Sequence, residues 1–292
     1  MEELRELAAF AAALREESIP TTARCAAACC VLDTVSAGAG ASDDPLVRRA
    51  TEELLPLYGT GGDAELWGRA RSAPLHAAVF LNALASHTLE LDDVHTASKT
   101  HIGTVVIPAA WGLARRLGVR GPRLVTAVVA GYETAARVGM ALGVVSHRKR
   151  GFHATGTAGV FGAAAACGNL LGLDEEHMLS ALGMAGTQAS GVWAFLADGA
   201  TCKALHPARA AANGLAAAYL ARAGMTGPSG ILAAEDGGLF AAMTDAPEPC
   251  RLNAGLGETW EILRLDRKPY PCCRSTHCAI DGALALRAEH GL

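Results

Sequence analysis

Residues 154–173, ATGTAGVFGAAAACGNLLGL, form an uncharged stretch that decides the fold. The stretch is long enough to cross a bilayer. Ala, Gly and Thr dominate it, however, and these residues contribute little transfer free energy into lipid. We therefore predict no membrane span but a buried helix, whose small residues let neighbouring helices approach closely.

The segments on either side of this stretch carry the same helical character. Leu4, Leu7, Phe10 and Leu14 recur at helical spacing, with charged residues on the opposite face. Capping residues, glycines and prolines separate successive helical segments. We predict helices within residues 3–18, 23–38, 44–57, 72–93, 103–118, 121–142, 156–172, 174–191 and 206–224, of which the one in 103–118 begins after Pro108.

The predicted helix over 72–93 has an unusual end. Ser72 is expected to cap its N-terminus, and Glu90, Asp92 and Asp93 then lie at its C-terminal end. Carboxylates at that end oppose the helix macrodipole, at a cost of roughly 0.3–1 kcal/mol each. Their position is therefore poorly explained by helix stability, although solvent screening reduces the cost.

The chain changes character near its end. Residues 259–271 are the first segment that fits a strand, and residues 278–292 return to a helical pattern. The sequence therefore predicts a mainly α protein, with an all-helical domain over residues 1–264 and the beginning of a smaller α/β unit over residues 265–292.

Composition excludes several classes of protein. Hydrophobic residues make up 51% of the 292 positions, which excludes intrinsic disorder. A net charge of −4, without a basic cluster, argues against a nucleic-acid partner. The nine cysteines cannot all pair, and the acidic N-terminus does not resemble a signal peptide. We expect reduced, mostly buried thiols in a cytoplasmic protein.

Residues 87–103, HTLELDDVHTASKTHIG, concentrate three carboxylates and three histidines. A metal site, an acid/base site and a crowded polar helix end are the competing interpretations. His95 and His101, with Asp92 and Asp93, match no compact metal signature. We therefore predict no metal at this stretch.

Three further stretches carry polar side chains where only packing is expected. His153 lies between a basic turn and a small-residue helix start. Lys203, His206 and Arg209 are spaced by three, so all three are expected on one face at a helix entry. The fourth stretch, KPYPCCRSTHCAID, contains Arg274 and His277 within residues 268–281.

Other chemistries fit less well. The glycines from 156 to 162 lack the spacing and the preceding strand of a dinucleotide-binding turn. Ser190 does not lie in the G-x-S-x-G pattern of a nucleophile elbow. Cys202 has one feature of a reactive thiol, the neighbouring cation Lys203, and no other. General acid/base catalysis on a small anionic substrate remains, with histidines moving protons and with Lys203 and Arg209 binding carboxylates.

At these residues the chain resembles the 2-methylcitrate dehydratase (MmgE/PrpD) family, which also includes cis-aconitate decarboxylases and iminodisuccinate epimerases. The resemblance rests on residues 87–110, 151–191, 195–228 and 268–281, in the order that the family has. It implies a helical domain and an α/β lid, a homodimer, an active site between the two domains, and no obligatory metal or cofactor.

The resemblance also implies which residues act. Carried over by position, the catalytic residues are Asp93, His101, His153 and Lys203. Glu90 and Asp92 are expected to bind substrate, with His206 and His277 nearby. Arg209 and Arg274, which the residue pattern alone indicated, complete the expected substrate-binding set.

The chain departs from the family pattern in two respects. Family members tend to have Asp at the position of Glu90 and Thr at that of Val94, and they usually have Pro at that of Ile102. They also continue well beyond residue 292, so the lid is expected to be incomplete. A missing lid would leave the cleft wet and catalysis weak.

The resemblance, together with the acid/base constellation, leads to a functional expectation. We expect a cofactor-independent lyase that dehydrates a small di- or tricarboxylate resembling 2-methylcitrate, by removing a proton α to a carboxylate. Decarboxylation and epimerisation begin with a similar carbanion and stay open as alternatives. A different alternative is a non-catalytic, lid-less scaffold or dimerisation protein.

Overall fold

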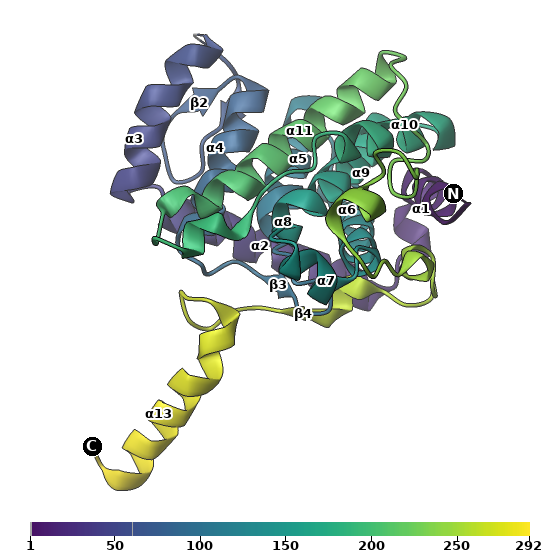
Figure 1. Cartoon of the computed structure of the whole chain (residues 1–292). Helices are drawn as coiled ribbons and strands as arrows, with labels where there is room; N and C mark the ends of the chain where they lie inside the picture. Colours follow the sequence, from purple (N-terminus) through teal and green to yellow (C-terminus); the bar gives the residue numbers. More distant parts are fainter. Residues whose placement is uncertain (1, 60) are drawn as a thin grey trace.

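The computed structural model describes residues 2–59 and 61–292, and helices dominate them (Figure 1). The prediction of a mainly α protein is confirmed. The α-helices are α1 Glu2–Ala13, α2 Thr21–Gly40, α3 Pro45–Leu54, α4 Leu75–Thr88, α5 Gly103–Leu117, α6 Gly121–Ala141, α7 Val144–Lys149, α8 Ala154–Thr157, α9 Gly159–Leu171, α10 Glu175–Gly186, α11 Leu205–Arg222, α12 Leu239–Met243 and α13 His277–His290. Short 3₁₀ helices are η1 Glu16–Ser18, η2 Leu55–Tyr58, η3 Trp193–Leu196, η4 Thr201–Ala204, η5 Pro249–Leu252, η6 Glu261–Arg264 and η7 Arg274–Thr276.

The core is built around α9, which packs against α5, α6 and α11. Residues 159–170 of α9 are all buried, so the prediction of a buried helix is confirmed. A Cβ added at Gly162 would lie 2.6 Å from the carbonyl oxygen of Gly131 on α6. The two backbones therefore approach so closely that only glycine fits.

The described helices were compared with the length and composition that a membrane span requires. Among the described residues, no helix taken singly has both the length and the apolar character that a bilayer crossing needs. Thr21–Gly40 and Pro45–Tyr58 meet the test only jointly, and they are bent by 87° relative to each other.

Helix α4 differs from its prediction at both ends. Ser72 does not cap it, because Ser72–Ala73 forms strand β2, antiparallel to β1 at Ala64–Glu65. The helix starts at Leu75, with Pro74 at the N-cap, and ends at Thr88. The acidic cluster therefore lies beyond the helix, and the predicted conflict with its macrodipole is wrong.

Helix α5 begins earlier than predicted. It starts at Gly103 and contains Pro108, although an interior proline removes a backbone donor. Residues 103–110 are all buried, so packing of this segment against the core outweighs the local cost.

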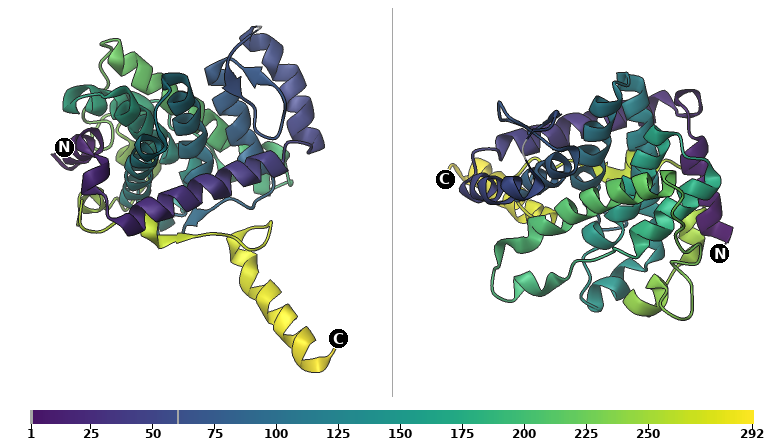
Figure 2. Two further views of the ribbon diagram at one scale, coloured as in Figure 1. Left: turned by 180° about the vertical axis from the view of Figure 1, so that it is seen from behind. Right: turned by 90° about the horizontal axis from the view of Figure 1, so that it is seen from above.

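The segment after residue 258 forms far less strand than predicted. Strand β4 contains only Leu265–Asp266 and pairs antiparallel with β3 at Val94–His95. Beyond it, α13 projects away from the helical body (Figures 1 and 2). The division into a helical domain and a lid stays a prediction, but β4 ties the start of the second unit to the loop after α4.

All nine cysteines are free. Only Cys30 and Cys167 are buried, so the expectation of mostly buried thiols is wrong. The exposed ones lie on surface turns and outward helix faces, where a small side chain meets no packing demand.

Candidate active site

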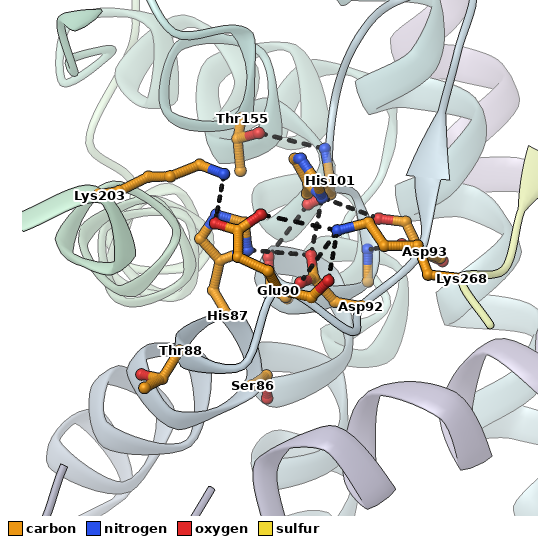
Figure 3. Close-up of polar contacts among 12 residues, drawn as sticks. Ser86, His87, Thr88, Glu90, Asp92, Asp93, His101, Thr155, Lys203 and Lys268 are labelled. Atoms are coloured by element: carbon orange, nitrogen blue, oxygen red, sulfur yellow. Dashed lines mark hydrogen bonds and ion pairs between the residues drawn. The ribbon is translucent and has the colours of Figure 1, made fainter. Parts of the chain in front are cut away.

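The stretch from His87 to Gly103 forms the connection between α4 and α5, and it carries a polar cluster (Figure 3). Glu90 and Lys99 adopt φ of 53°, a left-handed conformation that is uncommon outside glycine. Lys99 lies in the turn between His95 and Thr100, whose backbones are bridged antiparallel. Backbone strain of this kind is typical of functional sites.

Asp92 is the centre of the cluster. Its Oδ2 atom lies 3.0 Å from Nδ1 of His87 and 2.8 Å from Nδ1 of His101. Burial opposes the charge of Asp92, but the two imidazoles outweigh that penalty and hold the pKa of the carboxyl well below its usual range. The ionised carboxylate therefore orients both rings through their Nδ1 atoms.

Asp93 supports the site from behind. Its carboxylate accepts hydrogen bonds from the hydroxyl of Tyr132 at 2.6 Å and from the backbone N–H of Gly103 at 3.0 Å. Burial raises the pKa of Asp93 to about 6. Its carbonyl oxygen lies 3.0 Å from Nδ1 of His101. These contacts hold Asp93 against Tyr132, Gly103 and His101, and the catalytic role expected from the sequence stays a prediction.

The cluster also has the composition of a metal site. One ligand atom from each of His87, Asp92 and His101 lies within 4.8 Å of the others. The Nδ1 atom of His101, however, lies close to Asp92 Oδ2 and to the carbonyl oxygen of Asp93, both of which only accept hydrogen bonds. In this arrangement that nitrogen carries the hydrogen that it donates to them. Hydrogen bonding accounts for the cluster.

His95 does not join this group. Its ring nitrogens lie 2.9 Å from the Ser98 hydroxyl and 3.1 Å from Glu261 Oε2, in the core beneath β3. It ties the loop to η6 instead.

Two lysines balance the acidic charges. Lys203 Nζ forms an ion pair with Glu90 Oε1. Lys268 Nζ donates to the carbonyl oxygen of Glu90 at 2.8 Å and lies 3.9 Å from Asp92 Oδ1, with its side chain fully buried. Burial opposes the charge of Glu90, but His87 and Lys203 outweigh it and lower its pKa.

His153 approaches the cluster from a separate part of the chain. It precedes α8, and its Nδ1 lies 2.9 Å from Nδ1 of His206. Burial, reinforced by the positive potential of neighbouring His87, His101 and other groups, holds the pKa of His153 well below its usual range. His153 is therefore a neutral imidazole near pH 7, able to accept a proton.

A cavity of about 270 Å³ opens onto His101 and His153. It is large enough for a small organic acid. Its wall combines apolar and cationic side chains: Val94, Thr96, Lys99, His101, Val144, His147, Arg148, Phe152, His153, Ala154, Trp193, Cys273, Arg274 and Ser275.

The structure brings together most of the residues expected from the sequence. Glu90, Asp92, His101 and Lys203 form a continuous chain of contacts through His87. His206 joins through His153, and burial lowers the pKa of His206. Arg274 lines the cavity and lies 3.5 Å from Asp266.

Two expected substrate-binding residues lie elsewhere. The Arg209 guanidinium lies 5.5 Å from the centre of the Phe80 ring on α4, and Arg209 is not among the residues that line the cavity. His277 is buried at the start of α13, with Nε2 3.4 Å from the carbonyl oxygen of Cys272. The expectation that Lys203, His206 and Arg209 share one face stays a prediction.

Sequence reasoning missed His87 and Lys268. His87 is the first residue of the acidic stretch 87–103. Treating it as a candidate in the same way as His95 and His101 would have included it among the site residues. Lys268 likewise opens the fourth quoted stretch, but nothing in that stretch points to Glu90. It reaches Glu90 because β4 pairs with β3, a contact between residues far apart in the sequence.

The sequence of this chain also matches the model of a known protein family. Residues 5–251 match the model of the MmgE/PrpD N-terminal domain. The chain belongs to the MmgE/PrpD family. The resemblance seen in four stretches of the sequence is thus confirmed over residues 5–251.

Curated members of the MmgE/PrpD family extend the comparison. A cis-aconitate decarboxylase-like protein, oryM, of Aspergillus oryzae is 30% identical over 98% of this chain and 61% of its own length. The cis-aconitate decarboxylase of Aspergillus terreus is 27% identical over 98% of this chain and 60% of its own. The human cis-aconitate decarboxylase is 31% identical over 88% of this chain and 54% of its own. This MmgE/PrpD chain therefore spans less than two thirds of the length of these relatives.

The buried His147 of the cavity wall gives a pH-dependent prediction. Its Nε2 atom lies 3.0 Å from the Thr157 hydroxyl, and burial lowers its pKa from 6.5 to about 4. Between those pH values the unfolded chain binds a proton at this histidine that the folded chain does not, so folding loses stability as the pH falls. His147→Gln should remove this loss, worth about 3 kcal/mol at pH 4.

Urea unfolding of wild type and His147→Gln at pH 7 and pH 4 measures this loss of stability as the change in unfolding free energy between the two pH values. Taking the difference between the two proteins cancels the opposite contribution of Asp33 and Asp93, whose pKa values burial raises to about 6. A difference in unfolding free energy that does not change with pH would contradict the prediction.

Proposed function

We propose that this chain acts as a lyase that removes carbon dioxide from a small unsaturated polycarboxylate resembling cis-aconitate. The observation that carries the proposal is the meeting of His101 and His153 at one cavity, with the Glu90–Lys203 pair connected to His101 through His87 and Asp92. The names of the relatives favour decarboxylation over the dehydration expected from the sequence. Dehydration and epimerisation become the alternatives.

Lys203 handles the charge that develops in the reaction. When the bond to the departing carboxylate breaks, its electron pair stays on the substrate as an allylic carbanion that is delocalised into a remaining carboxylate. A cation next to that carboxylate stabilises the transition state more than the ground state. Lys203 fits this role because it is half-buried and its present partner, Glu90, is a carboxylate that a substrate carboxylate can replace.

His101 supplies the proton that completes the reaction. Its Nδ1–H is held by Asp92 and by the carbonyl oxygen of Asp93, which leaves Nε2 for the substrate. The buried Asp92 carboxylate stabilises the imidazolium form, as a carboxylate does behind a catalytic histidine. Protonated His101 then transfers a proton from Nε2 to the substrate carbon.

His153 provides the complementary group. Its lowered pKa keeps it neutral, so it accepts a hydrogen bond or a proton where His101 donates one. Two titratable groups whose environments differ in this way are typical of acid/base pairs. In an epimerase or dehydratase reaction, His153 would be the base that removes the α proton.

The test is a substrate panel followed by proton NMR in heavy water. The 292-residue chain is incubated separately with cis-aconitate, 2-methylcitrate, citrate and iminodisuccinate. Loss of cis-aconitate, with release of carbon dioxide and one solvent deuteron on carbon in the product, supports the proposal. Turnover of 2-methylcitrate or iminodisuccinate alone would favour dehydration or epimerisation, and no exchange in any of the four would favour a non-catalytic scaffold.

Variants separate the site from the fold. Lys203→Ala and His153→Ala should each lower kcat/KM for the active substrate by at least about 100-fold, because each removes a group that acts in the transition state. Circular dichroism and thermal unfolding show whether each variant folds. Normal activity in both folded variants would show that the chemistry takes place elsewhere.

A further inference from the structure

The cavity contains a cation that the proposed reaction leaves unused. Lys99, Arg148 and Arg274 all line it, in addition to the two histidines. Arg274 has a carboxylate partner in Asp266 at 3.5 Å. Within residues 2–59 and 61–292, neither Lys99 nor Arg148 forms an ion pair with a carboxylate, and of these two cations Arg148 is the one that lies over an aromatic ring.

Arg148 is held in place by an aromatic ring. Its guanidinium lies 4.3 Å from the centre of the Trp193 ring, within the range of a cation–π interaction. Trp193 in turn lies edge-on to His153, with ring centres 4.7 Å apart. The three side chains therefore form a row that ends at an acid/base residue.

The backbone fixes this row. The backbone N–H of Trp193 donates to the carbonyl oxygen of Gly151 at 2.8 Å. The backbone N–H of His153 donates to the carbonyl oxygen of Gly191 at 3.0 Å. Residues 151–153 and 191–193 are thus joined directly, and α7 with Arg148 precedes the first of them. A guanidinium that is already oriented loses little conformational freedom when it binds a ligand.

The neighbours of Arg148 show that its situation is particular. Arg150 pairs with Asp245 at 2.6 Å, outside the cavity. Lys149 is exposed and is not among the residues that line the cavity. Three basic residues follow one another at the end of α7 and its C-cap, at positions 148–150. Of these, Arg148 is the one that lines the cavity, and no carboxylate of the described residues pairs with it.

We propose that Arg148, oriented by Trp193, binds a second carboxylate of the substrate, distinct from the one that reacts, and so selects polycarboxylates over monocarboxylates. A guanidinium matches a carboxylate with two parallel hydrogen bonds. Val94, Val144 and Phe152 supply the apolar wall against which the carbon chain packs. This inference deepens the proposed function and rests on it for the identity of the reacting carboxylate.

Direct binding tests the subsite without requiring turnover. Calorimetry compares tricarballylate, a saturated tricarboxylate, with butyrate, a monocarboxylate, on wild type, Arg148→Gln and Lys149→Gln. Arg148→Gln should raise the Kd for tricarballylate by about 10- to 100-fold, the usual effect of losing a charge-assisted pair. The Kd for butyrate should change less than about threefold, and Lys149→Gln should match wild type for both ligands.

Each other outcome overturns the subsite. It is wrong if Arg148→Gln weakens both ligands equally, if Lys149→Gln has the same effect as Arg148→Gln, or if wild type does not prefer tricarballylate. Because Arg148 is exposed, Arg148→Gln should keep the wild-type Tm. Failure of the proposed function looks different: wild type would bind tricarballylate through Arg148 and yet turn over none of the four substrates of the panel.

Discussion

His101→Asn should lower the kcat for the active substrate by about 100- to 10,000-fold, the range expected when a general acid is removed. The asparagine amide can occupy the place of Nδ1–H and still donate to Asp92 and to the carbonyl oxygen of Asp93. Only the Nε2 position, which faces the cavity, is lost. The variant therefore separates proton transfer from the support of the loop, and its KM should change little. Steady-state kinetics in the carbon dioxide or NMR assay measures the effect.

His177→Asn is the matched control. His177 is exposed on α10, and its Nδ1 lies 2.7 Å from Asp174, remote from the cavity in the sequence and in its contacts. The same substitution there should leave kcat at the wild-type value. If His101→Asn retained more than half of the wild-type kcat while folding normally, His101 would not be the proton donor.

Gly162→Val should destabilise the fold by about 3 kcal/mol or more, the upper range for overpacking a core. A Cβ at Gly162 would lie 2.6 Å from the carbonyl oxygen of Gly131 and 2.7 Å from Cβ of Ala135. Both atoms belong to the rigid turns of α6, so neither can move aside as a long side chain can. Accommodation requires separation of α6 and α9, which costs the contacts along the centre of the core. Urea unfolding followed by circular dichroism measures the loss.

Gly282→Val provides the comparison. Gly282 lies on α13, and no atom lies within 4 Å of a Cβ added there. Substitution at this position should change the unfolding free energy by less than about 0.5 kcal/mol, as is usual for surface sites. Equal stability of the two variants would show that α6 and α9 do not require glycine at their crossing.

Local patterns predicted most of the helices because each helix is specified by its own residues. Asp44 and Asp174, the first residues of the predicted segments 44–57 and 174–191, cap α3 and α10. The errors occur where another segment intervenes. Ser72 pairs with Glu65 in a strand instead of capping α4, and burial keeps Pro108 inside α5.

The candidate site shows the same division. His101, His153 and Lys203 were identified by residue type and by family resemblance, and the structure brings them into one cluster. The roles of the carboxylates could not be assigned in advance. Asp92 and Asp93 are adjacent in the chain, yet one contacts two imidazoles and the other contacts Tyr132 and Gly103.

By itself, the sequence determined the helical class, the buried glycine- and alanine-rich helix and the family, because these depend on periodicity, side-chain size and residue order. Tertiary structure alone decided that Lys268 reaches Glu90, that Arg209 lies over Phe80, and that Arg148 stacks on Trp193. Each of these contacts joins residues far apart in the chain or depends on the angle at which a helix packs. Neither property is encoded in local spacing, because both arise only when the helices close around α9.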